Sequence, residues 1–385
     1  MVQKYGGTSL ATPRHIQNVA QRIQRCKDRG DDLVVVVSAM GHMTDHLTKL
    51  AYRTVAEPSQ REMDMLLSSG ERVSMALLAM ALEPLGISAI SFTGSQVGIL
   101  TSSDHRDAKI LEIRAQRLKD ALGKKQVAIV AGFQGVSFEK EITTLGRGGS
   151  DTTAVALAAS LGADYCEILT DVKGLYTADP RLVTDAHLIA ECSYQTCLEM
   201  SRLGAKMHVR SIELARRFGV KVVIRSSESW DDQGTVVSGM DESRGKMEGL
   251  KIQSVTSKDG LSFMKFEMRL KDWLAMSAKV PSALSCMQFS GDVVQVIVES
   301  EKAQSLTKLF PKEVVTQISD VALISLVGEG ICGSPEVISK MIQVLDQAGI
   351  EVILITSNSI SVSAAVPGRL KAAALQALHS HFISV

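Results

Sequence analysis

The sequence is poor in several features that mark specialised classes of protein. Its six cysteines are scattered at positions 26, 166, 192, 197, 286 and 332 without a CxxC pair, so we expect neither a zinc site nor a disulfide framework. Lys plus Arg and Asp plus Glu both number 42, and this balance gives no electrostatic reason to bind nucleic acid or an anionic membrane. The apolar runs stay well below the ~20 residues of a membrane span, and the first residues, MVQKYGGTS, include no apolar signal segment. We therefore expect a cytoplasmic globular protein.

The first ~230 residues alternate between strand-like and helix-like patterns, and the total of 385 residues suggests two or three domains. Val2–Tyr5 predicts a short strand, and Thr12 followed by Pro13 predicts the start of a helix. The run Leu33–Val37 is typical of a buried parallel strand. Further strands are predicted at 87–92, 127–133, 166–170 and 220–225, and helices at 60–85, 151–161 and 211–218. This alternation predicts an α/β/α sandwich with a mostly parallel sheet, which binds ligands at the carboxyl ends of its strands.

The composition changes after Arg225, where residues 226–246 are rich in Ser, Asp, Glu and Gly and predict a junction. The last part of the chain predicts a strand at 322–327, a helix at 336–348, strands at 350–355 and 360–366, and a helix at 370–378. This βαββα order is typical of a small ferredoxin-like module. The region from 250 to 320 predicts a looser copy, with strands at 261–268 and 293–298 and a helix near 271–279. We therefore predict one domain over 1–247 and a region over 248–385 with two modules, at about 250–320 and 321–385.

Two glycine-rich turns follow predicted strands. Gly6 and Gly7 let the backbone approach a phosphate closely, and Lys4 adds a positive charge. The second turn contains Arg147, whose guanidinium suits a carboxylate, and leads into a helix beginning near Asp151. A plain tight turn and a simple helix cap are the structural alternatives for these segments.

Other polar residues follow strands or interrupt an apolar helix. The segment 170–181, TDVKGLYTADPR, offers an aromatic ring, polar groups and a basic residue where a nucleotide site needs them, although a surface loop has the same composition. Glu71 lies in an otherwise apolar helix, where a lone Glu is usually exposed or paired. His42 and His46 are interpreted as solvated or hydrogen-bonded side chains rather than catalytic groups.

The chain resembles bacterial aspartate kinases of the amino-acid kinase superfamily over essentially its whole length. Several motifs carry the resemblance and occur in the family's order. They are KYGGTS at 4–9, SAMGHMTD at 38–45, SGER at 69–72, AGFQG at 131–135, TLGRGGSD at 144–151 and TDVKGLYTADPR at 170–181. The tail resembles the paired ACT domains that regulate such kinases.

The resemblance implies transfer of the γ-phosphoryl group of ATP to the side-chain carboxylate of L-aspartate. The product, 4-phospho-L-aspartate, feeds the diaminopimelate, lysine, threonine and methionine pathways. ATP with Mg²⁺ is the implied cofactor, without a dedicated protein metal cage. The implied catalytic residues are Lys4, Asp151 and Lys206. The implied ATP-binding residues are Lys4, Gly6, Gly7, Ser38, Thr170, Asp171, Tyr176, Asp179, Arg181 and Lys206, and the implied aspartate-binding residues are Thr44, Glu71, Phe133, Arg147 and Ser150.

Elementary chemistry agrees with this implication. Aspartate presents a carboxylate and an ammonium group, for which Arg147 and Glu71 are suitable partners. The side-chain carboxylate has a reference pKa of ~3.9 and is already ionised at neutral pH, so no general base is needed. Positioning and charge neutralisation are what the enzyme must supply.

The ACT-like tail leaves regulation open. We consider lysine or threonine as an effector, and a homo-oligomer formed through the ACT modules. A separate regulatory subunit could also start at Met240 or Met247. The rival functions are a related kinase acting on glutamate, acetylglutamate or uridylate, and a non-catalytic amino-acid sensor. A Rossmann dehydrogenase is not expected because no GxGxxG follows the first strand, and neither is a fused dehydrogenase, given the chain length.

Overall fold

The computed structural model describes residues 1–230, 232–239, 251–276, 280, 284–331 and 334–383. Within these ranges the chain forms two compact units. Unit 1 contains Met1–Leu175, Leu188–Leu198 and the chain from Met207 through strand β12. Unit 2 contains Tyr176–His187, Glu199–Lys206 and the chain from strand β13 onward. The predicted boundary at 247/248, like the start sites considered at Met240 and Met247, lies outside the described residues and stays a prediction.

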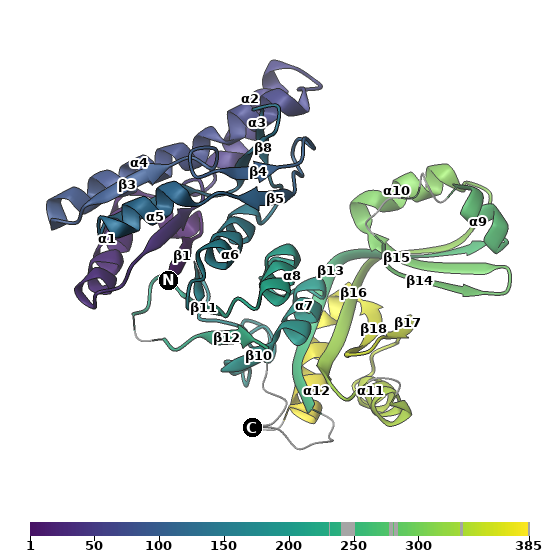
Figure 1. The fold of residues 1–385 in the computed structure, drawn as a ribbon. Helices are drawn as coiled ribbons and strands as arrows, with labels where there is room; N and C mark the ends of the chain where they lie inside the picture. The colour runs from purple at the N-terminus through teal and green to yellow at the C-terminus, as the bar shows by residue number, and fades with distance from the viewer. Residues whose placement is uncertain (231, 240–250, 277–279, 281–283, 332–333, 384–385) are drawn as a thin grey trace. The chain divides into compact units, whose positions relative to one another are not determined.

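Unit 1 is built on an eight-stranded sheet with the order β10-β12-β11-β9-β1-β2-β6-β3 (Figure 1). Strand pairs are parallel from β11 to β3, and β11–β12 is antiparallel. The sheet is therefore mostly parallel, as the alternating pattern predicts. Its strands are β1 (Val2–Tyr5), β2 (Val34–Val37), β3 (Ala89–Phe92), β6 (Val127–Ala131), β9 (Cys166–Thr170), β10 (Glu191–Ser193), β11 (Val222–Ser226) and β12 (Thr235–Ser238).

Helices cover both faces of this sheet. On one face, α1 (Pro13–Asp28) and α4 (Ser69–Leu82) share a core with Tyr5 and the valines of β2. Thr12 caps α1 by accepting a hydrogen bond from the His15 amide, as its position before Pro13 predicts. On the other face, α6 (Gly149–Leu161) packs on β1, β2 and β9, with α8 (Val209–Phe218) beside it. Since side chains alternate along a strand, Tyr5 faces α1 while Lys4 faces α6.

A smaller four-stranded sheet with the order β5-β4-β7-β8 adds to unit 1. Its β7 begins at Gln134, directly after a turn at Phe133, whose φ of 68° is left-handed. The strand predicted over 127–133 is thus β6 followed by this turn. The remaining helices and strands are α2 (Met43–Thr54), α3 (Gln60–Leu67), α5 (Gln116–Gly123), β4 (Ile99–Thr101), β5 (Ile110–Ile113), β7 (Gln134–Ser137) and β8 (Ile142–Thr144). Helix α7 (Tyr194–Arg202) begins in unit 1, and its residues from Glu199 onward belong to unit 2.

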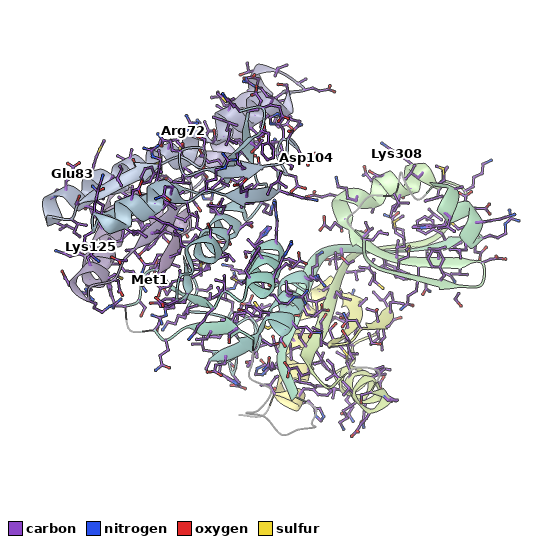
Figure 2. All side chains as sticks on the ribbon, in the orientation of Figure 1. Met1, Arg72, Glu83, Asp104, Lys125 and Lys308 are labelled. Carbon is purple, nitrogen blue, oxygen red and sulfur yellow. The ribbon has the colours of Figure 1, made fainter. Side chains whose placement is uncertain are left out.

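One helical stretch among the described residues, Gln60–Leu85, is long and apolar enough to be considered as a membrane span. It is divided into α3, which ends at Leu67, and α4, which begins at Ser69. The stretch carries the charged residues Arg72 and Glu83, both labelled in Figure 2. Its α4 packs against α1, β3 and β6, which are core elements of unit 1. The packing of α4 in the core of unit 1 therefore accounts for the apolar composition of this stretch.

Unit 2 contains a six-stranded antiparallel sheet with the order β14-β15-β13-β16-β18-β17. Its two long central strands each serve two modules. The first half of β13 pairs with the second half of β16, and their remaining halves pair with each other. The elements are β13 (Lys251–Glu267), α9 (Leu270–Met276), β14 (Leu284–Ser290), β15 (Val293–Glu299), α10 (Ser300–Leu309), β16 (Val314–Glu329), α11 (Pro335–Gln347), β17 (Leu354–Ser357), β18 (Ser361–Pro367) and α12 (Lys371–Phe382).

This sharing completes two ferredoxin-like modules. The βαββα segment starting within β16 gains its fourth strand from the first half of β13, which precedes it by more than fifty residues. The other module runs from the second half of β13 through α10 and closes with the first half of β16. The structure therefore confirms the architecture of the predicted fold class, an α/β/α sandwich of the amino-acid kinase type followed by two ferredoxin-like modules of the ACT type. The helix predicted near 271–279 is α9 as far as Met276, and residues 277–279 lie outside the described part.

Candidate active site

A cavity of about 260 Å³ opens in unit 1 where the parallel strands end. Segments that follow β1, β2 and β6 line it, together with the starts of α2, α4 and α6. Ligands bind at this edge in open α/β sheets. The lining residues are Lys4, Gly7, Ser38, Ala39, Gly41, Thr44, Glu71, Phe133, Gly146, Arg147, Gly148, Gly149, Ser150 and Asp151.

Lys4 and Asp151 form the central ion pair of this cavity. The Lys4 Nζ atom lies 2.7 Å from Asp151 Oδ1, and both side chains are largely buried. Asp151 belongs to the first turn of α6, where backbone amides favour negative charge. Beside them, a Cβ on Gly7 would lie 2.8 Å from the carbonyl oxygen of Ala39. Only glycine permits this approach of the two turns, whose backbones are joined by the Gly41 amide donating to Gly7 O.

Glu71 is a buried carboxyl group, with 3% of its surface exposed. Its Oε1 atom accepts a hydrogen bond of 3.1 Å from the Ala39 amide, while its buried Oε2 atom has no partner among the described residues. Burial raises the pKa of Glu71 to about 7. The start of α4 reaches this position because Gly70 carries no side chain, and a Cβ there would lie 2.8 Å from Ala39 Cβ. The unpartnered oxygen suits a cationic ligand group.

Arg147 stands in a glycine-rich turn with left-handed residues on both sides. Gly146 has φ +75° and Gly148 has φ +69°. The Arg147 side chain is exposed and makes no ion pair with any residue that the structure describes. A guanidinium so placed can take a carboxylate in a bidentate manner.

Phe133 and Ser150 connect this turn to the sheet. The Phe133 amide donates to Thr153 Oγ1 at 3.1 Å, and its carbonyl accepts from the Leu145 amide at 2.8 Å. A Cβ on Gly149 would lie 3.0 Å from the Phe133 ring, and one on Gly132 would lie 2.8 Å from Ser150 Oγ. The left-handed Phe133 therefore fixes the β6 end against the start of α6.

Comparisons of the sequence place the chain in a known family. The model of the Amino acid kinase family matches residues 1–226, and an ACT domain model matches residues 324–382. The chain is 42% identical to the aspartokinase of Mycolicibacterium smegmatis, over 99% of this chain and 96% of that protein. The chain belongs to the aspartokinase family. It is thus a kinase whose acceptor is a carboxyl group, and the predicted phosphorylation of L-aspartate by ATP, which begins the lysine, threonine and methionine branches, is confirmed at the level of the family.

Solved aspartokinases share the whole fold. E. coli aspartokinase III in complex with aspartate and ADP matches with a TM-score of 0.83 at 23% identity, covering 100% of this chain and 99% of that chain. The same enzyme in complex with lysine and aspartate matches with a TM-score of 0.80 at 24% identity, covering 100% of this chain and 99% of that chain. At 23% and 24% identity, this structural likeness shows that the fold is shared and nothing more.

The structure brings together many of the residues that the resemblance implies. Nine of them line the one cavity described above: Lys4, Gly7, Ser38, Thr44, Glu71, Phe133, Arg147, Ser150 and Asp151. Gly6 is next to them and donates its amide to Leu169 O at the end of β9. Thr170 is the last residue of β9, which pairs with β1, and Asp171 follows it. Neither residue lines this cavity, and Thr170 Oγ1 donates to Asp171 Oδ1 at 3.0 Å.

Four further residues of the prediction belong to unit 2: Tyr176, Asp179, Arg181 and Lys206. Arg181 donates to both oxygens of Asp179, at 3.0 and 2.7 Å. This bidentate bond lowers the pKa of Asp179. Lys206 is exposed.

Two residues near the cavity escaped the sequence analysis. His208 is half-buried against the glycine-rich turn, since a Cβ on Gly148 would lie only 1.9 Å from its ring atoms. Burial lowers the pKa of His208, so the neutral ring is favoured beside the cations of the site. Asp64 has no exposed surface and accepts from the His105 ring at 2.7 Å and the Arg106 amide at 3.2 Å. It thereby holds the loop that contacts Gly146. His208 follows the motif Gly204-Ala205-Lys206 at a short distance, but no pattern in the sequence marks Asp64.

Proposed function

We propose that the unit 1 cavity is where the γ-phosphoryl group of ATP passes to the side-chain carboxylate of L-aspartate. One observation supports this most directly. The Lys4–Asp151 pair shares a single cavity with Arg147 and Glu71. Such a set offers a cation for phosphate, a guanidinium for the α-carboxylate, and a carboxyl group for the α-ammonium of one small substrate.

The reaction requires little covalent help from the protein. An oxygen of the aspartate side chain forms the new P–O bond as the bond from the γ-phosphorus to the oxygen bridging it to the β-phosphorus breaks, and ADP leaves. The attacking carboxylate is ionised at neutral pH and loses no proton. Lys4 stabilises the negative charge on the transferring group, and Asp151 fixes the position of Lys4. The Gly7 amide is proposed to contact the phosphates. The Gly6 amide donates to Leu169 O, so the ATP-binding role implied for Gly6 stays a prediction.

Arg147 and Glu71 orient the acceptor. Holding both charged groups on the α-carbon leaves only the side-chain carboxylate free to react. A substrate ammonium near Glu71 Oε2 satisfies that buried oxygen and favours the ionised form of a carboxyl group whose pKa burial raises to about 7. Thr44, Phe133 and Ser150 are proposed to complete the aspartate pocket, and Ser38 contributes to the nucleotide side.

Mg²⁺ is proposed to enter with ATP. No group of three or more His, Cys, Asp or Glu side chains is arranged to hold a metal ion in the described part of the chain. The phosphates would therefore provide most of its ligands, with Asp151 as a carboxylate of suitable chemistry in the cavity. The ion neutralises phosphate charge when bound. The roles given to Thr170, Asp171, Tyr176, Asp179, Arg181 and Lys206 in binding ATP, and to Lys206 in catalysis, stay predictions.

The test is a hydroxylamine trap for the acyl phosphate. Purified protein is incubated with Mg·ATP, hydroxylamine and either L-aspartate or L-glutamate, and the hydroxamate is quantified. We expect product with aspartate only, a large loss of kcat in Lys4→Ala, and a raised KM for aspartate in Arg147→Ala. Hydroxamate from glutamate alone would favour a related kinase, and ATP binding without any hydroxamate would favour the amino-acid sensor.

We also propose that the C-terminal modules bind an amino-acid effector and join copies of the chain in the cytoplasm. The solved E. coli enzyme was in complex with lysine, which makes lysine the first candidate, followed by threonine. The exposed Met287 and Phe289 on the edge strand β14 support oligomer formation through these modules. Light scattering of the Phe289→Asp variant tests it, and an unchanged mass would oppose this edge as the interface.

A further inference from the structure

The acceptor pocket leaves one side of the sheet edge to the nucleotide. In-line phosphoryl transfer places the attacking and leaving oxygens on opposite sides of the phosphorus. The acceptor residues Glu71 and Phe133 lie on the side of β1 that β2 and β6 occupy, and Lys4 belongs to β1 itself. We therefore expect ADP to extend over the carboxyl ends of the strands on the other side of β1, which are β9 and β11.

A short loop after β11, residues 227–230, lies at this edge of the sheet. The Ser227 amide donates to Thr170 O at the end of β9, at 2.8 Å. Ser9 Oγ, in the segment that follows β1, donates to Ser227 Oγ at 2.7 Å. The loop is thus joined to the ends of β9 and β1, and it borders the space into which the nucleotide would extend.

Arg22 of α1 binds the backbone at both ends of this loop. Its Nη1 atom donates to Ser226 O at 3.1 Å and to Ser229 O at 3.0 Å, and only 6% of the residue is exposed. The guanidinium carbon also lies 5.6 Å from the centre of the Trp230 ring, within the range of a cation–π contact. The position of the loop therefore depends on one buried side chain.

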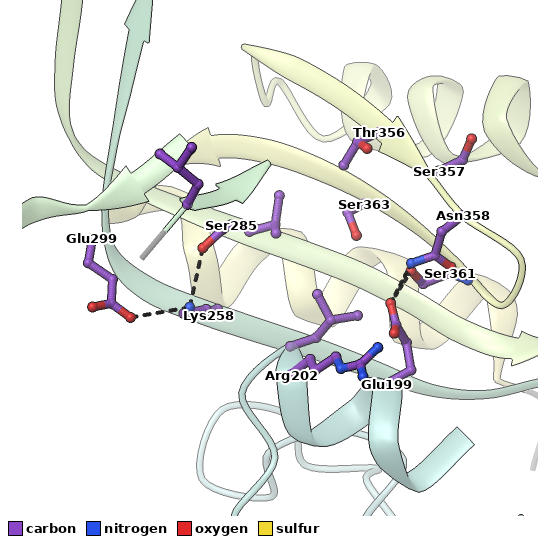
Figure 3. Close-up of a pocket in the computed structure, with 13 residues that line it drawn as sticks. Glu199, Arg202, Lys258, Ser285, Glu299, Thr356, Ser357, Asn358, Ser361 and Ser363 are labelled. Atoms are coloured by element: carbon purple, nitrogen blue, oxygen red, sulfur yellow. Dashed lines mark hydrogen bonds and ion pairs between the residues drawn. The ribbon is translucent and has the colours of Figure 1, made fainter. Parts of the chain in front are cut away.

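A buried carboxylate holds Arg22 in turn. The side chain of Glu167 in β9 is 3% exposed, and its Oε1 atom lies 3.7 Å from Arg22 Nη2 and 3.3 Å from Arg225 Nη1. The Lys258–Glu299 pair of unit 2, drawn in Figure 3, differs because 30% and 46% of those side chains are exposed. Solvated ions can exchange their partners for water, whereas a buried charge has to keep its partners. Arg22 is therefore confined to one orientation.

We propose that Arg22 is a positioning residue for ATP, which keeps the loop 227–230 in the conformation that receives the nucleoside part of the nucleotide. Arg22 does not line the cavity proposed for phosphoryl transfer, so it acts through the loop and not on the reacting atoms. A buried ion pair contributes little net stability compared with apolar side chains, so a required loop conformation explains this arginine better than stability does. The inference deepens the proposed kinase function and rests on it.

The test is isothermal titration calorimetry of the full chain with Mg·ATP in the absence of aspartate, and the hydroxamate assay in parallel. Arg22→Met removes both hydrogen bonds to the loop carbonyls, and Glu167 keeps Arg225 as its partner in this variant. Arg25→Met is the control. Arg25 lies on the same helix and 3.9 Å from the centre of the same Trp230 ring, but it makes no hydrogen bond to the loop within the described part of the chain.

We expect Kd and KM for ATP to rise about tenfold or more in Arg22→Met, since hydrogen bonds to a charged group are lost. Arg22→Lys should show a smaller rise, because an ammonium group reaches fewer of these partners than a guanidinium does. Arg25→Met should match the parent. The kcat and the KM for aspartate should stay near the parent values in all three variants, which a general loss of structure would not allow.

The results separate this inference from the proposed function. An unchanged Kd for ATP in Arg22→Met, or an equal rise in Arg25→Met, overturns the positioning role. A parallel rise of KM for ATP and for aspartate also overturns it. If Arg22→Met does not fold, a Kd in Arg22→Lys equal to that of the parent overturns it instead. Weaker ATP binding in Arg22→Met, when the parent forms no aspartyl hydroxamate, supports the positioning role and contradicts the kinase proposal.

Discussion

Lys4 Nζ and Asp151 Oδ1 lie 2.7 Å apart, joining the central strand of the sheet to the first turn of α6. Because a buried ammonium group needs a fixed counter-charge, Asp151 determines the position of the Lys4 ammonium group in the cavity.

We expect Lys4→Ala to lower kcat by about 100- to 1,000-fold, the typical cost of removing a group that stabilises transition-state charge. Asp151→Asn should also lower kcat, and the double variant should be little worse than Lys4→Ala, since both act on one interaction. Single-turnover hydroxamate formation measures these rates. Additive losses in the double variant would show that Asp151 acts independently of Lys4.

Glu71 should give aspartate binding a pH dependence. Because burial raises its pKa to about 7, the carboxyl group is mostly protonated below that pH and ionised above it. If the ammonium of aspartate pairs with the ionised form, as proposed above, kcat/KM for aspartate should rise about tenfold from pH 6 to pH 8. In Glu71→Gln this rise should be absent and KM high throughout, as steady-state kinetics would show.

The same shift has an opposite effect on stability. A folded-state pKa above the unfolded value means that the folded protein holds this proton more tightly, so the contribution of Glu71 is greatest in acid and declines as the pH rises towards about 7. Urea denaturation should show a weaker decline for Glu71→Gln over this range. An identical decline in both proteins would mean that Glu71 titrates near its ordinary value.

Gly148 and Gly162 form a matched pair at the two ends of α6, both left-handed, with φ of +69° and +61°. Gly162→Ala should cost only the backbone strain of about 1 kcal/mol, because nothing lies within 4 Å of its new Cβ. Gly148→Ala meets the His208 ring and should displace the Arg147 turn, raising KM for aspartate well beyond the control. His208→Ala in the Gly148→Ala background should recover part of that loss. Equal kinetics for the two single variants would refute the contact.

Asp64→Ala should destabilise unit 1 by about 2–4 kcal/mol, because the buried Thr144 hydroxyl and Arg106 amide lose their acceptor. The exposed Asp104, labelled in Figure 2, is the control, and Asp104→Ala should change stability by less than about 0.5 kcal/mol. Chemical denaturation of both variants measures the difference. Similar midpoints would mean that water replaces the Asp64 carboxylate.

The elements near the site were predictable because local chemistry determines them. Pro13 after Thr12 starts α1, and the valines of β2 suit a strand buried on both faces. The unbroken family motifs contain Lys4, Arg147 and Glu71, so the resemblance implies a role for each residue from its position in its motif. The sequence predicts one helix over 60–85, whereas the structure divides it at Ser68 into α3 and α4. No proline or glycine precedes Ser68 in this stretch, so the apolar pattern gives no sign of the division.

Long-range contacts explain what the sequence could not show. Asp64 reads as an ordinary helix residue, and only folding brings Thr144 to it from eighty residues away. The turn at Phe133 was predicted as strand because a left-handed φ in a non-glycine residue is imposed by Thr153 and Leu145 rather than by local preference. The double use of β13 and β16 depends on register between distant strands, which no local pattern records.

The sharing of β13 and β16 also limits how the C-terminal region can be inherited. A cut near residue 320, where the sequence pattern separates the modules, would leave the second without the strand that β13 supplies, whereas the first would keep the half of β16 that pairs with the second half of β13. The second module therefore cannot be moved into another protein without the segment that begins at Lys251. A regulatory fragment made from an internal start that contains a complete second module must begin no later than Lys251.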